Sequence, residues 1–381
     1  MNPIYLDYNA TTPISAEVAE SMLPFFKEFG NPSSNHVFGK RARVAVDEAR
    51  AKVARLLGCK PEEIYFTSGG SEANNWALKG ATSLQKQAHI LTTQIEHPAI
   101  LNVCRYLESH GVGTTYFPVQ KNGVVDVNRM ATTLDEENIS FVSVMHANNE
   151  VGTIQPIREI ATLAKRHNLI VHTDAAQSAG KIPVDVEELD VDLLSVAGHK
   201  LYAPKGIGAL YCKEGLALEN LIHGAGHERG RRAGTENVLL IVALGKACEL
   251  AENRIHLQQT GVRTLRDFFQ KTLLEKIPDA KINGLEAERL PNTLSISMRN
   301  VQSHDILHQI ENKVACSAGS ACHAGEVSIS PVLQAMQVPP DFAAGTLRLS
   351  LGISTTKEDI ENAAQVIIEA VENVQADHPG Q

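Results

Sequence analysis

The chain has 381 residues and a formal net charge of −9, with 43% hydrophobic and 21% charged residues. This length exceeds what one hydrophobic core usually supports, so two domains are expected, and the acidic balance argues against nucleic-acid and anionic-membrane partners. The six cysteines form no CxxC pair and no metal-ligand spacing with histidine, and the N-terminus lacks the features of a signal peptide. Because no apolar run approaches the length of a membrane span, we predict a cytoplasmic protein with free thiols and no metal site.

Two loops rich in turn-forming residues come before the first long helix. Residues 7–13 form a small, polar segment that leads into a helix, and residues 30–34 form a second such loop. The simplest interpretation of both loops is connection. The alternative, that Asn31 and its neighbours line a substrate pocket, makes Asn31 a candidate substrate-binding residue. Apolar spacing in residues 40–57 then predicts a helix.

Strands and helices alternate through the middle of the chain. Predicted strands cover residues 64–67, 89–93, 114–118 and 141–146, and predicted helices cover residues 98–107, 125–134 and 156–167. This alternation is typical of a mostly parallel, doubly wound sheet with helices on both faces.

The first of these strands leads directly into a glycine-rich helix start. The residues are Ser68-Gly69-Gly70-Ser71-Glu72. Free N–H groups and the positive end of a helix dipole bind phosphate, and glycine lets the backbone approach the anion closely. No GK[ST] sequence follows, so the segment is not a Walker loop, and ordinary helix capping is the competing explanation.

The segment 169–211 contains the most distinctive set of polar side chains. Asp174 and Gln177 follow one apolar run, and His199 and Lys200 follow the next. An amine that forms an imine, together with an acid that keeps a pyridine nitrogen protonated, is what an aldehyde cofactor such as pyridoxal 5'-phosphate (PLP) needs. We therefore expect Lys200 to carry PLP.

Polar residues follow several of the predicted strands, and we expect them to line one site. They are Gly70, Ser71, His97, Asn149, Asp174, Gln177, His199 and Lys200. The reason is that ligands of open α/β sheets bind in the crevice at the carboxyl ends of the strands. Each residue alone has an ordinary explanation: His97 as a helix cap, Asn149 as a turn former, and Asp174 as the partner of a surface base.

The C-terminal part contains two further candidate site residues. After a basic, glycine-rich loop, the pattern of residues 237–274 predicts one long helix that links the domains. The segment 314–325 is rich in Ser, Ala and Gly, which predicts a mobile loop that presents the thiol of Cys322 to solvent. The alternative is that Cys322 is an ordinary small residue. Arg348 lies in an apolar strand, where a buried guanidinium needs an anion such as a substrate carboxylate.

A series of short motifs gives nearly the whole chain a resemblance to a known family. The motifs are YLDYNATTP, FTSGGSE, EH, NNE, DAAQ, GHK, RAGTEN, LPNT, GSACH and LRLSLG. Together they resemble the NifS/IscS-type cysteine desulfurases, in the class-V aminotransferase family of fold-type I PLP enzymes. The motifs VHTDAAQ, GTEN, LPNT and ACH are also similar to those of selenocysteine lyase, the sister activity in the same family.

The resemblance implies an α/β fold with two domains and a homodimeric assembly. Residues 14–252 would form a large PLP-binding domain around a mostly parallel, seven-stranded sheet flanked by helices. Residues 1–13 and 253–381 would form a smaller α+β domain that carries the mobile Cys322 loop.

The resemblance also implies a role for each site residue. Lys200 would bind PLP covalently, Asp174 would pair with the pyridine nitrogen, Gln177 with the phenolic oxygen, and His97 would stack on the ring and help to move protons. The phosphate would be held by Gly70, Ser71 and His199 with Thr235 of the partner subunit, and the substrate carboxylate by Asn149 and Arg348. Cys322 would accept the sulfur.

Two positions depart from the family pattern. Ala197 stands where many relatives have a phosphate-binding serine, which puts one phosphate contact in doubt but not the cofactor. His323 follows Cys322, and a positively charged imidazole there would favour the thiolate form.

The activity that the resemblance implies is conversion of L-cysteine to L-alanine. The sulfur would stay on Cys322 as a persulfide and pass to a protein acceptor, such as a scaffold for iron–sulfur cluster or other cofactor assembly. Release of selenium from L-selenocysteine is the first alternative. Other PLP-dependent aminotransferases and lyases have no use for Cys322, and a non-enzymatic scaffold on this fold would be expected to lack Lys200 or Asp174.

Overall fold

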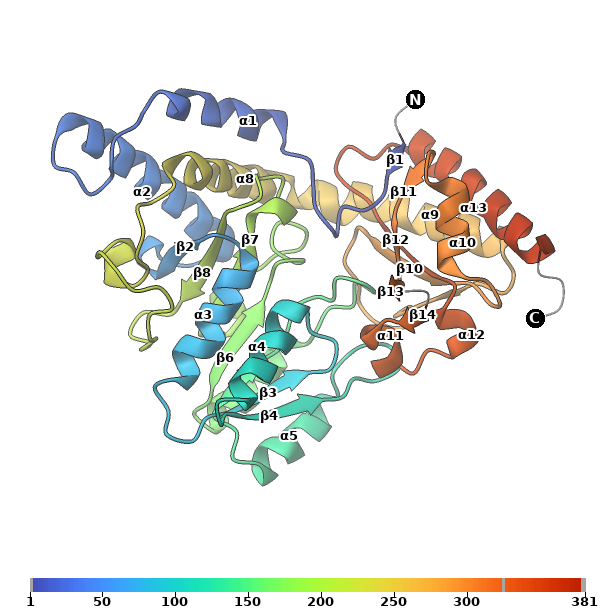
Figure 1. The fold of residues 1–381 in the computed structure, drawn as a ribbon, viewed down its shortest axis with the longest axis horizontal. Coiled ribbons are helices and arrows are strands. Elements are labelled where there is room, and N and C mark those ends of the chain that lie inside the picture. Colours follow the sequence, from blue (N-terminus) through green and yellow to red (C-terminus); the bar gives the residue numbers. More distant parts are fainter. Residues whose placement is uncertain (1–2, 324–325, 378–381) are drawn as a thin grey trace.

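A seven-stranded sheet forms the centre of the N-terminal part of the computed structural model, which describes residues 3–323 and 326–377 (Figure 1). In order across the sheet, its strands are β2 (Ile64–Thr67), β8 (Gly208–Cys212), β7 (Leu193–Ala197), β6 (Ile170–Asp174), β5 (Phe141–Ser143), β3 (His89–Thr93) and β4 (Gly113–Phe117). Neighbouring strands are parallel except at β8, which runs antiparallel to β2 and β7. The predicted mostly parallel, seven-stranded sheet is confirmed.

Helices cover both faces of this sheet, as expected for a doubly wound fold. One face packs against α3 (Gly70–Thr82) and α4 (Pro98–Glu108). The other face packs against α2 (Val37–Leu57), α5 (Val127–Glu136), α6 (Ile157–Arg166), α7 (Val186–Leu189) and α8 (Val238–Leu257). The short α1 (Ala16–Met22) lies beside α8 (Figure 1). Because the sheet is covered on both sides, the strands β2, β5, β7 and β8 are buried along their whole length.

A second, smaller sheet is built from the C-terminal part of the chain. Its antiparallel strands, in order, are β12 (Ser317–Ala318), β15 (Thr346–Ser350), β10 (Thr293–Ser297) and β9 (Lys281–Ile282). They pack against α9 (Arg263–Lys276), α10 (Ser303–Ile310) and α13 (Lys357–Asp377) in a second hydrophobic cluster. Leu6 joins this cluster, because β1 (Ile4–Tyr5) pairs in parallel with β11 (Val314–Ala315). The predicted domain boundaries, with residues 14–252 in the large domain and residues 1–13 and 253–381 in the small one, stay a prediction.

The predicted long helix over residues 237–274 is interrupted. A π-helical turn, Gln258–Val262, separates α8 from α9. Gly261 in this turn weakens the helix locally, since glycine favours helices less than other residues do. Among the described residues, no helix combines the length and the apolar content needed to cross a membrane.

The segment predicted as a loop over residues 314–325 contains regular structure. In the backbone, β13 (Ser320–His323) pairs antiparallel with β14 (Glu326–Ile329), and Cys322 lies opposite Val327. Small residues alone suggested a loop, whereas pairing with the following strand satisfies the backbone hydrogen bonds. The thiol of Cys322, the imidazole of His323 and residues 324–325 lie outside the described part of the chain. The short helices α11 (Pro331–Ala335) and α12 (Pro340–Ala343) follow.

Candidate active site

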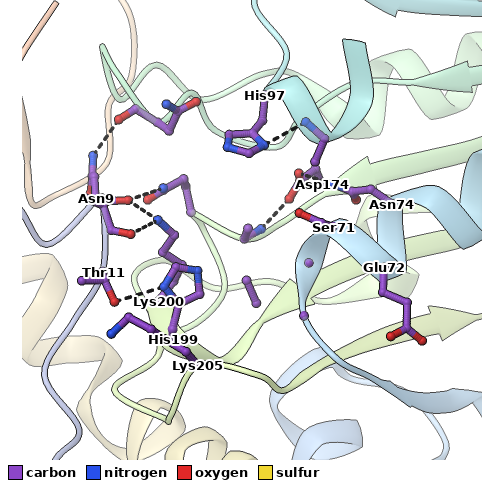
Figure 2. Close-up of a pocket in the computed structure, with 18 of the residues that line it drawn as sticks. Asn9, Thr11, Ser71, Glu72, Asn74, His97, Asp174, His199, Lys200 and Lys205 are labelled. Atoms are coloured by element: carbon purple, nitrogen blue, oxygen red, sulfur yellow. Dashed lines mark hydrogen bonds between the residues drawn. The ribbon is translucent and has the colours of Figure 1, made fainter. Parts of the chain in front are cut away.

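A cavity of about 720 Å³ opens at the carboxyl ends of the parallel strands, next to the second sheet (Figure 2). Its wall includes all eight residues that the sequence predicts at strand ends, together with Arg348. They are Gly70, Ser71, His97, Asn149, Asp174, Gln177, His199, Lys200 and Arg348. These residues come from segments far apart in the sequence, and the crevice expected of an open α/β sheet brings them together.

Lys200 lies in a single 3-10 turn directly after β7, and its amine is largely removed from water. Its Nζ donates hydrogen bonds to the carbonyl oxygens of Asn9 and Ala10, the latter at 2.6 Å. Burial, reinforced by the Arg348 cation, lowers the pKa of Lys200 from 10.5 to about 8, although Asp7 and Asp174 act in the opposite direction. The amine is therefore neutral, and nucleophilic, in a much larger fraction near neutral pH than an ordinary lysine amine.

Asp174 ends β6 and presents a buried carboxylate to the cavity. Its Oδ2 accepts a hydrogen bond from Asn74 Nδ2 at 2.7 Å, and its Oδ1 accepts one from the Ala176 N–H at 2.9 Å. Within the described residues it forms no ion pair. A buried carboxylate with neutral partners alone is suited to a cationic ligand nitrogen, because a charge inside a protein is costly unless it is paired.

Two histidines of the cavity are held in the neutral form. Burial lowers the pKa of His97, with Asp174 raising it and Lys200 lowering it. Burial, together with Lys200, Lys205 and His97, lowers the pKa of His199 to about 4. His97 also caps α4: its Nδ1 accepts a hydrogen bond from the Ala99 N–H at 3.1 Å, so in the neutral ring the proton is on Nε2. The cap explanation is correct, and the same residue lines the cavity.

The start of α3 forms the glycine-rich end of the cavity. Gly69 has a φ of 154° and Gly70 begins the helix, so backbone N–H groups face the space without side chains in front of them. A Cβ on Gly70 would come within 3.2 Å of the Ala197 side chain. Ala197 therefore lies beside this helix start and contributes no hydroxyl to it.

Arg348 meets an anion, as expected, but that anion belongs to the protein. Its Nη2 donates to Asp7 Oδ1 and to Ser317 Oγ, both at 2.9 Å, while its Nη1 approaches the Asn149 carbonyl at 3.4 Å. Its Nε is buried and has no hydrogen-bond partner among the residues that the structure describes. Since a guanidinium has five N–H donors, Arg348 keeps donor capacity for a second carboxylate.

Sequence analysis missed the contribution of the N-terminal loop. Asn9, Ala10 and Thr11 line the cavity, and Thr11 Oγ1 lies 3.1 Å from His199 Nδ1 (Figure 2). The loop was interpreted as a connection because its sequence is only small and polar. Asn74 was also missed, although it lies one helical turn after Gly70 and on the same helix.

Three predicted site residues are not placed in the cavity by the described part of the single chain. Asn31 lies in an exposed loop, where its Oδ1 accepts a hydrogen bond from the Ser33 N–H at 2.9 Å. Thr235 lines a neighbouring hollow of about 130 Å³ that shares Ser68 with the cavity. The thiol of Cys322 lies outside the described residues. The roles of all three stay predictions.

A family model described as aminotransferase class-V matches residues 4–363. The chain belongs to the class-V aminotransferase family. Cysteine desulfurase IscS of Dictyoglomus turgidum is 46% identical over 380 residues, which cover 99% of this chain and 96% of the relative. Cysteine desulfurase IscS of Methanosarcina thermophila is 44% identical, and the match covers 97% of this chain and 92% of the relative.

Solved structures of similar proteins have the same fold. A NifS-like protein superposes with a TM-score of 0.91 at 37% identity and covers 98% of this chain and 100% of its own. A structure described as SspA in complex with cysteine gives a TM-score of 0.80 at 36% identity, with 92% and 99% covered. The resemblance and the PLP-enzyme fold class inferred from the motifs are confirmed.

Proposed function

We propose that the protein is a PLP-dependent cysteine desulfurase that converts L-cysteine to L-alanine and leaves the sulfur on Cys322. The main observation behind this proposal is that Lys200 and Asp174 line the same cavity in a chain of the class-V aminotransferase family. The relatives named above are called cysteine desulfurases, which favours sulfur over the selenium alternative.

The residues of the cavity fit PLP group by group. Lys200 would bind the aldehyde, Asp174 the pyridine nitrogen, and Gln177 the phenolic oxygen. The start of α3, with Gly70 and Ser71, would hold the phosphate. The Oδ1 of Asn74, buried beside Asp174, has no hydrogen-bond partner in the described part of the chain, and a bound group would supply one. When bound, PLP draws electrons away from the substrate Cα through its protonated ring.

The side chains around the cofactor have two kinds of role: some bind the substrate and others transfer protons. Asn149 and the remaining N–H groups of Arg348 hold the substrate carboxylate, which orients the Cα–H bond. Lys200, once its amine is free and neutral, takes the Cα proton. Neutral His97 carries a proton on Nε2 that it can pass on, since its Nδ1 is occupied by the α4 cap.

The sulfur step needs a thiolate, and five of the six cysteines are unsuited to supply one. Burial is the first cause that raises the pKa of each of their thiols, to between about 11 and about 12: Cys59, Cys104, Cys212, Cys248 and Cys316. Cys322 remains as the candidate. Its thiolate attacks the substrate sulfur, the carbon–sulfur bond breaks, the carbon is reduced and protonated to give alanine, and the sulfur stays behind as a persulfide.

The proposed enzyme acts as a homodimer. Large apolar side chains are exposed around the turn after α1 and the start of α2, with Leu23 at 62%, Phe26 at 69% and Phe29 at 82% exposure. Such a patch is typical of an interface between proteins. Dimerisation would also give Thr235 of the partner subunit a phosphate to bind. A cytoplasmic location and a protein acceptor for the sulfur, such as a scaffold, complete the proposal.

The direct test is alanine release by the purified, PLP-loaded protein. We expect L-cysteine to be turned over, with sulfide appearing when a reducing agent is added. L-Selenocysteine, assayed at the same concentration, measures the alternative. A protein that released alanine from L-selenocysteine but not from L-cysteine would contradict the proposal.

The Lys200 amine should control the pH dependence of cofactor binding. Only the neutral amine adds to an aldehyde, so the rate at which cofactor-free protein binds PLP is expected to rise with pH, with its midpoint at about 8. Arg348→Met removes a cation that lowers the pKa of Lys200, so it should move the midpoint to higher pH. Asp7→Asn removes an anion that raises the pKa, so it should move the midpoint to lower pH. Stopped-flow absorbance measures the rate, and shifts in the same direction for both variants would refute this electrostatic account.

A further inference from the structure

Lys181 is a buried lysine directly behind the cavity, and none of the roles above uses it. Only 5% of its surface is exposed, and within the described residues it forms no ion pair. Its Nζ donates to Gln177 Oε1 at 2.8 Å and to Asn9 Oδ1 at 3.2 Å. Lysines are almost never fully buried unless they are paired, so this position calls for an explanation.

The first of these contacts fixes the amide of Gln177. Gln177 Nε2 donates to the Asn9 carbonyl at 3.0 Å, and Gln177 Oε1 receives the Lys181 amine. A carbonyl oxygen only accepts hydrogen bonds, so a reversed amide would place Gln177 Oε1 against the Asn9 carbonyl and lose that contact. One N–H of Gln177 is left over, and Gln177 lines the cavity.

The second contact ties the same lysine to the N-terminal loop. Asn9 Oδ1 accepts from Lys181 and, at 3.0 Å, from Asn292 Nδ2. Asn9 Nδ2 donates to Thr293 Oγ1 at 2.8 Å, at the start of β10 in the second sheet. The carbonyl of Asn9, which receives the Lys200 amine, is thereby held in place (Figure 2).

The protonated form of Lys181 is unfavourable at this buried position. Burial lowers the pKa of Lys181 well below its usual 10.5, and the cations of Lys200 and Arg348 add to the effect. Both the ammonium and the neutral amine can donate to the two amide oxygens, so the contacts do not depend on the charge. A methionine of similar length would leave Gln177 Oε1 buried without a donor, which favours rotation of the amide.

We propose that Lys181 is a positioning residue that holds the Gln177 amide with its free N–H directed to the cofactor. The inference deepens the proposed function and rests on it, because the group that Gln177 meets is the phenolic oxygen of PLP. Lys181 acts through Gln177, so its contribution disappears when Gln177 has no amide.

A double-mutant cycle in the cofactor-bound protein tests this role. Lys181→Met is expected to weaken PLP binding on the order of tenfold, as for the loss of one hydrogen bond, and to shift the visible absorption maximum of bound PLP. Gln177→Ala should have an effect of similar size. In the Gln177→Ala background, Lys181→Met should change the affinity for PLP by less than about twofold. The two effects are non-additive because Lys181 acts through the Gln177 amide, which this background lacks.

The controls separate positioning from general damage and from failure of the function itself. Lys213→Met, at an exposed lysine outside the cavity, should leave affinity and spectrum unchanged. If Lys181→Met does not fold by circular dichroism, Lys181→Leu, which also lacks a donor, takes its place in the same cycle. Fully additive effects, or a wild-type spectrum and affinity in the lysine variant, would overturn the inference. Wild-type protein that fails to bind PLP would instead overturn the proposed function.

Discussion

Lys200→Ala is expected to abolish both the visible absorbance that depends on covalently attached PLP and the release of alanine. The variant loses the nucleophilic amine that meets the aldehyde, and it loses the base that takes the Cα proton. A positioned general base alone contributes about 10²–10⁴-fold to a rate, so turnover should fall by more than about 10³-fold. Absorbance spectra and alanine release measure the two losses separately.

Lys205→Ala is the matched control, since Lys205 is a second lysine in the wall of the same cavity. We expect this variant to retain the visible absorbance, because Lys205 is exposed, whereas burial lowers the pKa of the Lys200 amine to about 8. The protein should stay folded in both variants, as the hydrogen bonds of the Lys200 amine to described residues are those to two backbone carbonyls of the N-terminal loop. An unchanged spectrum in Lys200→Ala would remove Lys200 from the mechanism.

The part of the site carried by the parallel sheet was predictable from the sequence. Asp174 and Lys200 each follow a short apolar run, and parallel strands must place their carboxyl ends on one edge. His97 and Asn149 follow the same rule. The sequence alone is enough to predict that these residues lie close together, because the strands that precede them are neighbours in a parallel sheet.

The contributions of the N-terminal loop were not predictable in the same way. Asn9 contacts Gln177, Lys181 and Lys200, all more than 160 positions away in the sequence. Its place depends on β1 joining the second unit of the fold and on the backbone N–H of Asn9 donating to Ser350 Oγ at 2.9 Å. A strand of two residues leaves no periodic pattern to detect.

The expectation that Arg348 pairs with an anion is confirmed, but the anion is not the predicted one. A guanidinium in an apolar strand requires an anion, and the structure supplies Asp7 from the N-terminal loop. The sequence could not identify this partner, because the pair joins the two ends of the chain. The carboxylate of a substrate is therefore an additional ligand for Arg348 and not the reason that its burial is tolerated.

Cys322→Ala is the second substitution with a large expected effect, and it should separate cofactor binding from sulfur transfer. We expect normal PLP absorbance and loss of L-cysteine desulfuration by about 10³-fold or more, since removal of a covalent nucleophile in other enzymes costs up to about 10⁶-fold. The reason is that the breaking carbon–sulfur bond needs an acceptor that takes the sulfur while the carbon is reduced.

Cys316→Ala is the control for this substitution, because Cys316 lies only six residues earlier and burial raises the pKa of its thiol to about 12. It should keep desulfuration and should still form a persulfide, detected by mass spectrometry on the peptide that contains Cys322. In Cys322→Ala, that modification should be absent. If Cys322→Ala turned over L-cysteine at the wild-type rate, the acceptor would have to be another group, and the depressed reactivity of the five buried thiols would then point outside the cysteines altogether.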